Sequence, residues 1–370
     1  MNFEFATSNR IIFGCGTLAQ AAPAAAQFAR RALVVTGRNT ERARPLLAAL
    51  KKEGVEFKLF PLGSEPTVED AQQAAALKCD LVIGFGGGSV IDLAKAAAAL
   101  MTNIGDPFDY LEVIGKGKPL TVRPVPCIAI PTTAGTGSEV TKNSVLSSPE
   151  HRVKVSMRHP LMIPDLAIVD PECTLSMPPA VTAATGLDAL TQLLEAFISK
   201  TANPMTDGFC REGLPRAVRS LRRAFENGSD LAAREEMSLA SLFGGLALAN
   251  AGLGAVHGFA GPVGGMFAAP HGLVCAALLP HVMKMNLAVM KDQSRLQEFA
   301  RMTGGKTAED GIHWIAGLCR DLQVPSLSAL GVTEADLPVL IEKAQRSSGM
   351  KTNPVELTEM ALTTILQEAL

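Results

Sequence analysis

Two of the chain's six histidines, His257 and His271, lie in one stretch of small residues between positions 249 and 272. Glycines and alanines fill most positions between them, so the backbone and a ligand can approach each other closely there. A single histidine with apolar neighbours is more often a core residue than a ligand. Two of them, with Asp188 upstream, instead favour a divalent metal, because imidazole and carboxylate groups suit iron or zinc. We therefore expect Asp188, His257 and His271 to meet in a catalytic metal centre.

The part of the chain that carries these residues has helical patterns from residue 180 onward. Helices are expected over residues 180–199, 207–226, 231–251 and 271–290, with several more before the C-terminus. In the first helix Asp188 and Gln192 are spaced i and i+4 and so share one face. His271 follows a proline at a helix start, and His257 lies in a glycine-rich segment after a long helix. Cys275, one turn after His271, either lines the pocket or is an inert buried thiol.

The residues before this helical part follow a different pattern. Short apolar runs bounded by glycine or proline predict buried parallel strands over residues 32–36, 57–60, 81–85 and 127–130. Helical segments over residues 42–52, 68–77 and 89–101 lie between them. This alternation predicts a doubly wound α/β domain with a Rossmann-like parallel sheet. Pro178-Pro179 marks the boundary, which gives a dinucleotide-binding domain over 1–178 and a helical metal and substrate domain over 179–370.

A glycine-rich turn, Gly86-Gly87-Gly88-Ser89, connects the strand at 81–85 to an alanine-rich helix. Glycines allow close backbone approach, and the helix N-terminus offers free N–H groups and a positive dipole end to a pyrophosphate. Asp92, on the first turn of that helix, complements the same dipole. The hydroxyl-rich sequence PTTAGTGSEVTKNSV at 131–145 follows another strand. It is either an ordinary polar loop or part of the crevice where open α/β sheets bind ligands.

Several of these motifs, in this order, resemble those of the iron-containing (group III) alcohol dehydrogenases. The matching motifs are GGGS with Asp92, PTTAGTGSEVT at 131–141, ATGLDAL at 184–190, and GLGAVHG with PHG within 252–272. The resemblance covers nearly the whole chain and implies the dehydroquinate synthase-like architecture, an α/β domain followed by an all-α domain. It also implies an NAD(P)-dependent oxidoreductase that interconverts an alcohol and an aldehyde or ketone by hydride transfer, with the carbonyl oxygen polarised by iron or zinc.

The same resemblance assigns roles to individual residues. It implies that Asp188, Gln192, His257 and His271 hold the metal. The residues it assigns to cofactor binding are Gly37, Gly86, Gly87, Gly88, Ser89, Asp92, Thr132, Thr133, Thr136, Thr141, Asn143 and Lys154. For Lys154 a solvated surface position is the alternative.

Two positions depart from the family pattern and indicate a branch with an altered metal site. Gln192 stands where the family has a histidine ligand, and an amide oxygen is a poorer donor to iron or zinc than imidazole. Gly261 stands where the family has a histidine near the substrate. A proton must then come from water, a substrate group or a ribose hydroxyl. The missing side chain also leaves room beside His257 for a bulkier or more polar substrate.

The residues after the strand at 32–36 bear on the choice of cofactor. NAD-preferring relatives have an aspartate there, which binds the ribose hydroxyls and repels a 2′-phosphate. This chain has Gly37-Arg38-Asn39 instead. We therefore expect NADP to be tolerated or favoured.

Two other functions stay open at this point. A metal-independent keto-acid reductase, similar to the maleylacetate reductases, would reduce its substrate without a Lewis acid. A catalytically impaired relative would bind the dinucleotide without turnover. Metal analysis and an activity screen distinguish these alternatives.

Composition and charge limit the classes of partner and the cellular compartment that we expect. The 34 basic and 36 acidic residues give a net charge of −2, which offers no argument for nucleic acid or an anionic membrane. Seven scattered cysteines without a CxxC pair fit reduced cytosolic thiols. The N-terminus lacks the pattern of a signal peptide, and no run of 18 apolar residues occurs. We expect a cytoplasmic enzyme with a small alcohol or aldehyde substrate, and the resemblance implies a homodimer or larger homo-oligomer.

Overall fold

The computed structural model describes residues 2–151, 153–267 and 269–370. The chain divides into two compact units, an α/β unit of residues 6–133 and 137–174 and a helical unit. The helical unit consists mainly of residues 175–370, together with Ala134–Thr136 and the N-terminal residues up to Phe5. The predicted domain boundary at Pro178-Pro179 lies just before the first long helix of the helical unit, which begins at Pro179.

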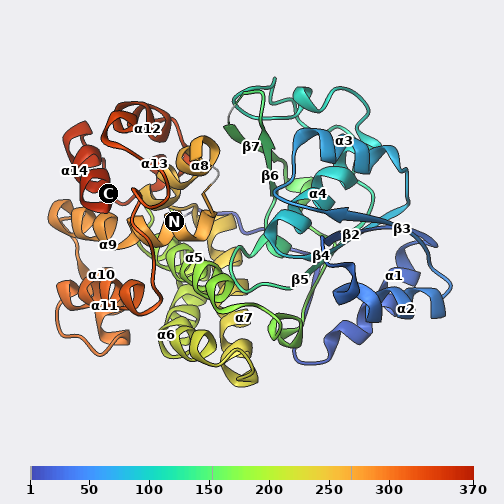
Figure 1. Cartoon of the computed structure of the whole chain (residues 1–370), viewed down its shortest axis with the longest axis horizontal. Coiled ribbons are helices and arrows are strands. Elements are labelled where there is room, and N and C mark those ends of the chain that lie inside the picture. The colour runs from blue at the N-terminus through green and yellow to red at the C-terminus, as the bar shows by residue number, and fades with distance from the viewer. Residues whose placement is uncertain (1, 152, 268) are drawn as a thin grey trace. The chain divides into compact units, whose positions relative to one another are not determined.

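The α/β unit is built on a parallel six-stranded sheet with the strand order β1-β8-β5-β4-β2-β3. Figure 1 labels β5, β4, β2 and β3 of this sheet. In chain order its strands are β1 (Arg10–Phe13), β2 (Arg31–Gly37), β3 (Glu56–Leu62), β4 (Leu81–Gly86), β5 (Cys127–Pro131) and β8 (Leu166–Val169). The sequence predicted β2, β3, β4 and β5, which are neighbours in the sheet. It did not predict β1 and β8, the strands at the other edge of the sheet.

Helices cover both faces of this sheet, as the doubly wound prediction requires. Along β2, Leu33 and Val35 pack in one apolar cluster with helices α3 (Val68–Ala76) and α4 (Gly88–Thr102). The alternate residues Ala32 and Val34 pack in a second cluster with α1 (Ala21–Phe28) and α2 (Arg44–Lys52). Successive side chains of a strand point to opposite faces, so one apolar strand supplies both cores.

The connections of this sheet change direction between β2 and β4. From β2 the chain runs through α2 to β3 at one edge, whereas from β4 it runs through α4 to β5 on the other side. Ligands of open α/β sheets bind outside the carboxyl ends of the strands at such a switch point. The sheet therefore places the turn after β4 where a dinucleotide is expected.

An antiparallel hairpin of β6 (Asn143–Ser148) and β7 (Val153–Arg158) follows β5 and was not predicted. The sequence placed residues 143–145 in a polar loop, but they begin β6. Alternate β6 residues are buried, with Ser144, Leu146 and Ser148 inward. Two serines among three inward positions weaken the apolar alternation that identifies a half-buried strand.

The helical unit is arranged around α5 (Pro179–Ile198), which packs against the next two helices and against α9. In chain order the others are α6 (Pro204–Glu226), α7 (Leu231–Ala251), α8 (Ala255–Phe267), α9 (His271–Val289), α10 (Ser294–Met302), α11 (Ala308–Asp321), α12 (Leu337–Gln345), α13 (Ser348–Thr352) and α14 (Glu359–Ala369). From Gly186 to Ile198 every residue of α5 is buried. Polar side chains in that span must therefore find partners within the protein.

Helix α8 contains His257 and covers the glycine-rich segment for which the sequence predicted no particular helix. It is helical although it contains several glycines and Pro262, residues that disfavour helix interiors. Burial of Val256, Phe259 and Val263 in the main apolar cluster stabilises it. Tertiary packing here outweighs local propensity.

Helix α9 is long and apolar enough to span a bilayer by composition alone, and α7 with α8 would qualify only as a pair bent by 100°. In α9, 56% of the apolar window is buried inside the protein. Core helices of folded proteins pass the same compositional test. The described residues thus contain no helix with a clear membrane-spanning character.

Candidate metal centre and cofactor site

Helix α5 carries three polar residues on one face, Asp188, Gln192 and Glu195, at i, i+4 and i+7. All three are buried, with 2%, 3% and 1% of their surfaces exposed. Burying a carboxylate without partners costs far more than one hydrogen bond returns. The two carboxylates therefore have to be paired, and their partners lie mainly on α8 and α9.

The structure brings Asp188, His257 and His271 together. Asp188 Oδ1 lies 3.3 Å from His257 Nε2 and 3.7 Å from His271 Nε2. Cys275 joins them, with its Sγ 3.8 Å from His257 Nε2 and 3.6 Å from His271 Nε2. One ligand atom from each of the four residues lies within 4.8 Å of every other, so the group could hold a metal ion. His271 is partly exposed, which leaves the cluster open on its side.

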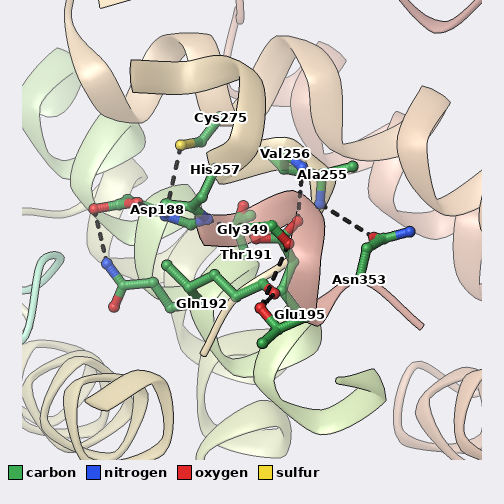
Figure 2. A network of polar contacts seen from close by, with 12 residues as sticks. Asp188, Thr191, Gln192, Glu195, Ala255, Val256, His257, Cys275, Gly349 and Asn353 are labelled. Carbon is green, nitrogen blue, oxygen red and sulfur yellow. Dashed lines mark hydrogen bonds and ion pairs between the residues drawn. The ribbon is translucent and has the colours of Figure 1, made fainter. Parts of the chain in front are cut away.

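Glu195 fixes the orientation of one of these imidazoles. Its Oε2 lies 2.6 Å from His257 Nδ1, and its Oε1 accepts a hydrogen bond of 2.7 Å from the Val256 N–H (Figure 2). A carboxylate that accepts a hydrogen bond from Nδ1–H favours the tautomer whose Nε2, on the Asp188 side, carries the lone pair that a metal ligand requires. The sequence reasoning missed Glu195. The available signal was a lone carboxylate seven residues after Asp188 in an apolar helix.

A second polar group holds the start of α8 in place. Asn353 Oδ1 accepts a hydrogen bond of 3.1 Å from the Ala255 N–H (Figure 2). The Asn353 amide nitrogen donates to Asn286 Oδ1 of α9 at 2.9 Å. One buried amide near the end of the chain thus connects the helices that carry His257 and His271.

Gln192 contacts the carboxylate of Asp188 rather than the imidazoles. Its Nε2 donates to Asp188 Oδ2 at 3.1 Å, and Figure 2 shows the amide oxygen pointing away from His257. That oxygen is buried and has no hydrogen-bond partner among the described residues. It faces Gly244 and lies 3.1 Å from the position that a Cβ on this glycine would occupy. Gln192 therefore orients Asp188 with its Oδ1 toward the two histidines.

The charges within the cluster stabilise one another. Burial raises the pKa of Asp188, but its hydrogen bond with His257 and the charge of His271 outweigh burial and bring the pKa below its usual value. Burial lowers the pKa of His257, but Cys275, Asp188 and Glu195 hold it well above the usual value. Burial likewise raises the pKa of Cys275, and the two imidazoles bring it below that of an ordinary thiol. Anionic ligands in one buried place favour a divalent cation, so the donor set fits a metal.

Gly261 lies on α8 one turn after His257. Apart from its chain neighbours and the nearby backbone of α8, a Cβ at this position would meet no atom of the described residues within 4 Å. The space where the family has a histidine is therefore open, in agreement with the expectation of added room beside His257.

Seven of the residues expected at the cofactor gather at the carboxyl ends of β2, β4 and β5. They are Gly37, Gly86, Gly87, Gly88, Ser89, Thr132 and Thr133. The Thr132 N–H donates to the Gly86 carbonyl at 2.9 Å, and a Cβ on Gly87 would lie 3.3 Å from the Thr133 side chain. A Cβ on Gly86 would lie 2.6 Å from Val90, so only glycine lets α4 begin this close to β4.

In this structure Asp92, Thr141 and Asn143 make contacts within the protein that hold the loop before β6. Asp92 Oδ2 accepts a hydrogen bond of 2.9 Å from the Val145 N–H, and Oδ1 accepts one from the Ser138 hydroxyl. The fully buried Lys95 pairs with Asp92 at 3.2 Å, donates to Thr141 Oγ1 at 3.1 Å and donates to the Asn143 carbonyl. The loop before β6 is thereby tied to α4. The sequence signal for Lys95 was a single lysine in an alanine-rich helix.

Glu139 lies in the same loop and is buried, with 2% of its surface exposed. Burial raises the pKa of its carboxyl to about 7. This group is neutral over most of the acidic range and becomes a buried charge above it.

The remaining two residues expected at the cofactor lie elsewhere. Lys154 on β7 forms an ion pair of 2.5 Å with Glu65, and 11% of its side chain is exposed. Thr136 belongs to the short segment Ala134–Thr136 of the helical unit. In that segment a Cβ on Gly135 would lie 2.6 Å from the Thr185 side chain of α5.

Comparison with known proteins gives matches over both halves of the chain. Residues 8–171 match the family model for iron-containing alcohol dehydrogenases, and residues 182–370 match the model for the C-terminal part of Fe-containing alcohol dehydrogenases. The chain is 37% identical over 363 residues to 1,3-propanediol dehydrogenase of Citrobacter freundii, covering 92% of this chain and 91% of that protein. It is 37% identical over 385 residues to long-chain-alcohol dehydrogenase 1 of Geobacillus thermodenitrificans, covering 97% and 96%.

Solved structures agree with these matches. A crystal structure of 1,3-propanediol oxidoreductase superposes with a TM-score of 0.94 at 34% identity, over 100% of both chains. Sulfoacetaldehyde reductase from Bifidobacterium kashiwanohense, solved in complex with NAD+, superposes with a TM-score of 0.91 at 30% identity, over 100% of this chain and 99% of that one.

Proposed function

Because this chain belongs to the iron-containing alcohol dehydrogenase family, whose members interconvert alcohols and aldehydes with a nicotinamide cofactor and a metal, we propose that Asp188, His257 and His271 hold that metal here. The observation that carries this proposal is the convergence of one carboxylate oxygen and two imidazole nitrogens, with separations of 3.3 and 3.7 Å from the carboxylate. Glu195 supports it, since it holds His257 in the tautomer that ligates.

When bound, a divalent metal supplies Lewis-acid polarisation of the carbonyl oxygen and stabilises the alkoxide. The chain's own residues hold and orient the groups around it. Asp188 contributes a negative charge, and Gln192 fixes which carboxylate oxygen faces the imidazoles. Gly261 provides no side chain to carry a proton, so the proton exchanged with the alkoxide comes from water, a substrate group or a ribose hydroxyl.

We propose that the nicotinamide cofactor lies at the switch point between β2 and β4 and that NADP is accepted. Arg38 follows β2 and is exposed. Its guanidinium lies beside Gly63, 3.5 Å from the position that a Cβ on this glycine would occupy. An arginine here accommodates a 2′-phosphate, whereas an acidic residue would repel it.

The cofactor proposal is tested with Arg38→Ala, and with Arg44→Ala on the exposed face of α2 as the matched control. A charge-assisted hydrogen bond contributes about 1.5–3 kcal/mol, so we expect KM for NADPH to rise about 10-fold to 100-fold in Arg38→Ala. KM for NADH should not change. Equal changes for both cofactors, or none for NADPH, would contradict the assignment.

The metal proposal is tested by elemental analysis together with a screen of aldehydes and keto acids for NADPH oxidation. We expect about one divalent metal per chain in the wild type, activity toward aldehydes, and loss of both in His271→Ala. Full activity in chelator with keto acids would identify a metal-independent reductase instead. Cofactor binding without activity on any substrate would identify an impaired relative.

We further propose that the enzyme acts on a small alcohol or aldehyde as a cytoplasmic homodimer or larger homo-oligomer. None of the seven cysteines, all of which lie within the described residues, forms a disulfide. Free thiols are typical of a reducing compartment. Light scattering behind size-exclusion chromatography tests the assembly, and a monomeric mass would contradict it.

A further inference from the structure

We propose that the Cys275 thiolate is the fourth ligand of the metal, in place of Gln192, and that the resulting Asp-His-His-Cys set selects zinc. This inference rests on the proposed metal site and specifies its chemistry. Cys275 is fully buried on α9, one turn after His271 and on the same face. Its Sγ is directed to the two imidazoles, as Figure 2 shows for His257.

Four of the six separations between the ligand atoms support tetrahedral coordination. Zinc binds sulfur at about 2.3 Å and imidazole nitrogen at about 2.0–2.1 Å, so tetrahedral angles place the sulfur about 3.6 Å from each nitrogen. Cys275 Sγ lies 3.6 Å from one Nε2 and 3.8 Å from the other. The same construction places oxygen and nitrogen ligands about 3.3 Å apart. The corresponding distances from Asp188 Oδ1 are 3.3 and 3.7 Å.

A neutral thiol accounts for only part of this arrangement. An S–H group has one hydrogen, so it can donate to one imidazole nitrogen but not to both. The metal-free alternative is a thiolate that accepts hydrogen bonds from two protonated imidazoles, and the metal-binding experiments below distinguish it from a ligand. His257 Nδ1 is directed to Glu195, which leaves its Nε2 as an acceptor or a ligand. A cation at the centre explains both short sulfur contacts and both carboxylate contacts at once.

Gln192 is not placed to fill the fourth position. Its nitrogen donates to Asp188 Oδ2, and its oxygen faces Gly244 of α7. Rotating the amide to present the oxygen would break the hydrogen bond that orients Asp188. In this chain, therefore, Gln192 orients the Asp188 carboxylate instead of binding the metal. The fourth donor is Cys275 of α9.

A thiolate changes which metal the site prefers. Imidazole and carboxylate ligands suit both iron and zinc, whereas soft thiolate ligands favour zinc. A wild-type protein loaded anaerobically with equal Zn²⁺ and Fe²⁺ should retain zinc in clear excess. Cys275→Ala should reduce that preference.

The decisive experiment uses cobalt as a spectroscopic substitute for zinc. We expect the full-length Co²⁺ protein to show the near-ultraviolet sulfur-to-cobalt charge-transfer band together with visible bands of a tetrahedral site. The charge-transfer band should disappear in Cys275→Ala and persist in Gln192→Ala. Cys210→Ala is the matched control, because Cys210 is also fully buried but lies on α6 outside the cluster.

Zinc affinity, measured by competition with a chromophoric chelator, gives a second readout. We expect Kd to rise at least about 100-fold in Cys275→Ala, and about 10-fold in Gln192→Ala, the lower end of the range of about 10-fold to 100-fold for positioning partners. Bound cobalt without the charge-transfer band in the wild type would overturn the Cys275 assignment and leave the proposed metal site standing. Failure of the wild type to bind either metal would overturn the proposed site itself. The wild-type spectrum decides the assignment even if Cys275→Ala does not fold.

Discussion

Replacing Glu195 with glutamine tests how far the metal site depends on a residue that does not touch the metal. The change keeps the shape of the side chain and removes its charge. Glutamine can still accept the hydrogen bond from the Val256 N–H through its oxygen. Its NH2 group then faces His257 Nδ1, which contacts the wild-type carboxylate at 2.6 Å. Because two donors would oppose each other, the imidazole proton moves to Nε2, and the lone pair needed for ligation is lost.

The size of the effect follows from this tautomer change. Outer-shell partners of this kind contribute about 10-fold to 100-fold to metal affinity, or about 1.4–2.7 kcal/mol. At a free zinc concentration 100 times the wild-type Kd, binding stabilises the native wild type by about 2.7 kcal/mol. A variant with 100-fold weaker affinity is stabilised by only about 0.4 kcal/mol under the same conditions. The zinc-dependent part of stability should therefore largely disappear.

Two measurements check the prediction for Glu195→Gln. Chelator competition gives the zinc Kd, and urea unfolding with and without zinc gives the stabilisation by metal. Glu235→Gln, at an exposed position on α7, is the control and should behave as wild type in both. Unchanged zinc affinity in Glu195→Gln, with full stabilisation by zinc, would refute the tautomer argument.

Three further predictions concern stability. A Cβ on Gly272 would lie 2.1 Å from the Ala184 carbonyl oxygen. Gly272→Ala should therefore destabilise the protein by about 1–3 kcal/mol in urea unfolding. A variant as stable as the wild type would contradict this contact. Gly261→Ala has open space and should instead stabilise by about 0.5–1 kcal/mol, because glycine disfavours a helix interior; a lower midpoint would show that the space is filled. Burial raises the pKa of Glu139 to about 7 from an ordinary 4.5, so between these values the unfolded chain releases a proton that the folded chain keeps. Stability should therefore fall as pH rises through this window, by on the order of 3 kcal/mol, and Glu139→Gln should abolish that slope between pH 4.5 and 8.

The sequence predicted the elements with strong local patterns. Strand β4, the glycine turn and α4 were all located, since a short apolar run, a Gly-rich turn and a long alanine helix are local signals. Helix α8 was not located, because its stability comes from burial rather than from its own residues. The hairpin of β6 and β7 was missed because serines interrupt its inward face.

Site chemistry was predicted where residue type alone is informative. Asp188, His257 and His271 were identified as candidates from their types and neighbours, and the structure brings them together. The roles of Glu195 and Cys275 depend on which helices pack side by side, and spacing along the chain does not contain that information. For Gln192 the sequence could not distinguish a ligand from a residue that orients one, because the two roles differ only by rotation of an amide.

The buried amide of Asn353 has a consequence for the order in which a newly made chain matures. Helices α8 and α9 emerge from the ribosome well before residue 353, yet the N–H of Ala255 has its partner on that late residue. A nascent chain that stops short of this asparagine leaves a buried donor beside Glu195 unmatched. The start of the helix that carries His257 therefore gains its full set of hydrogen bonds only after residue 353 has been translated.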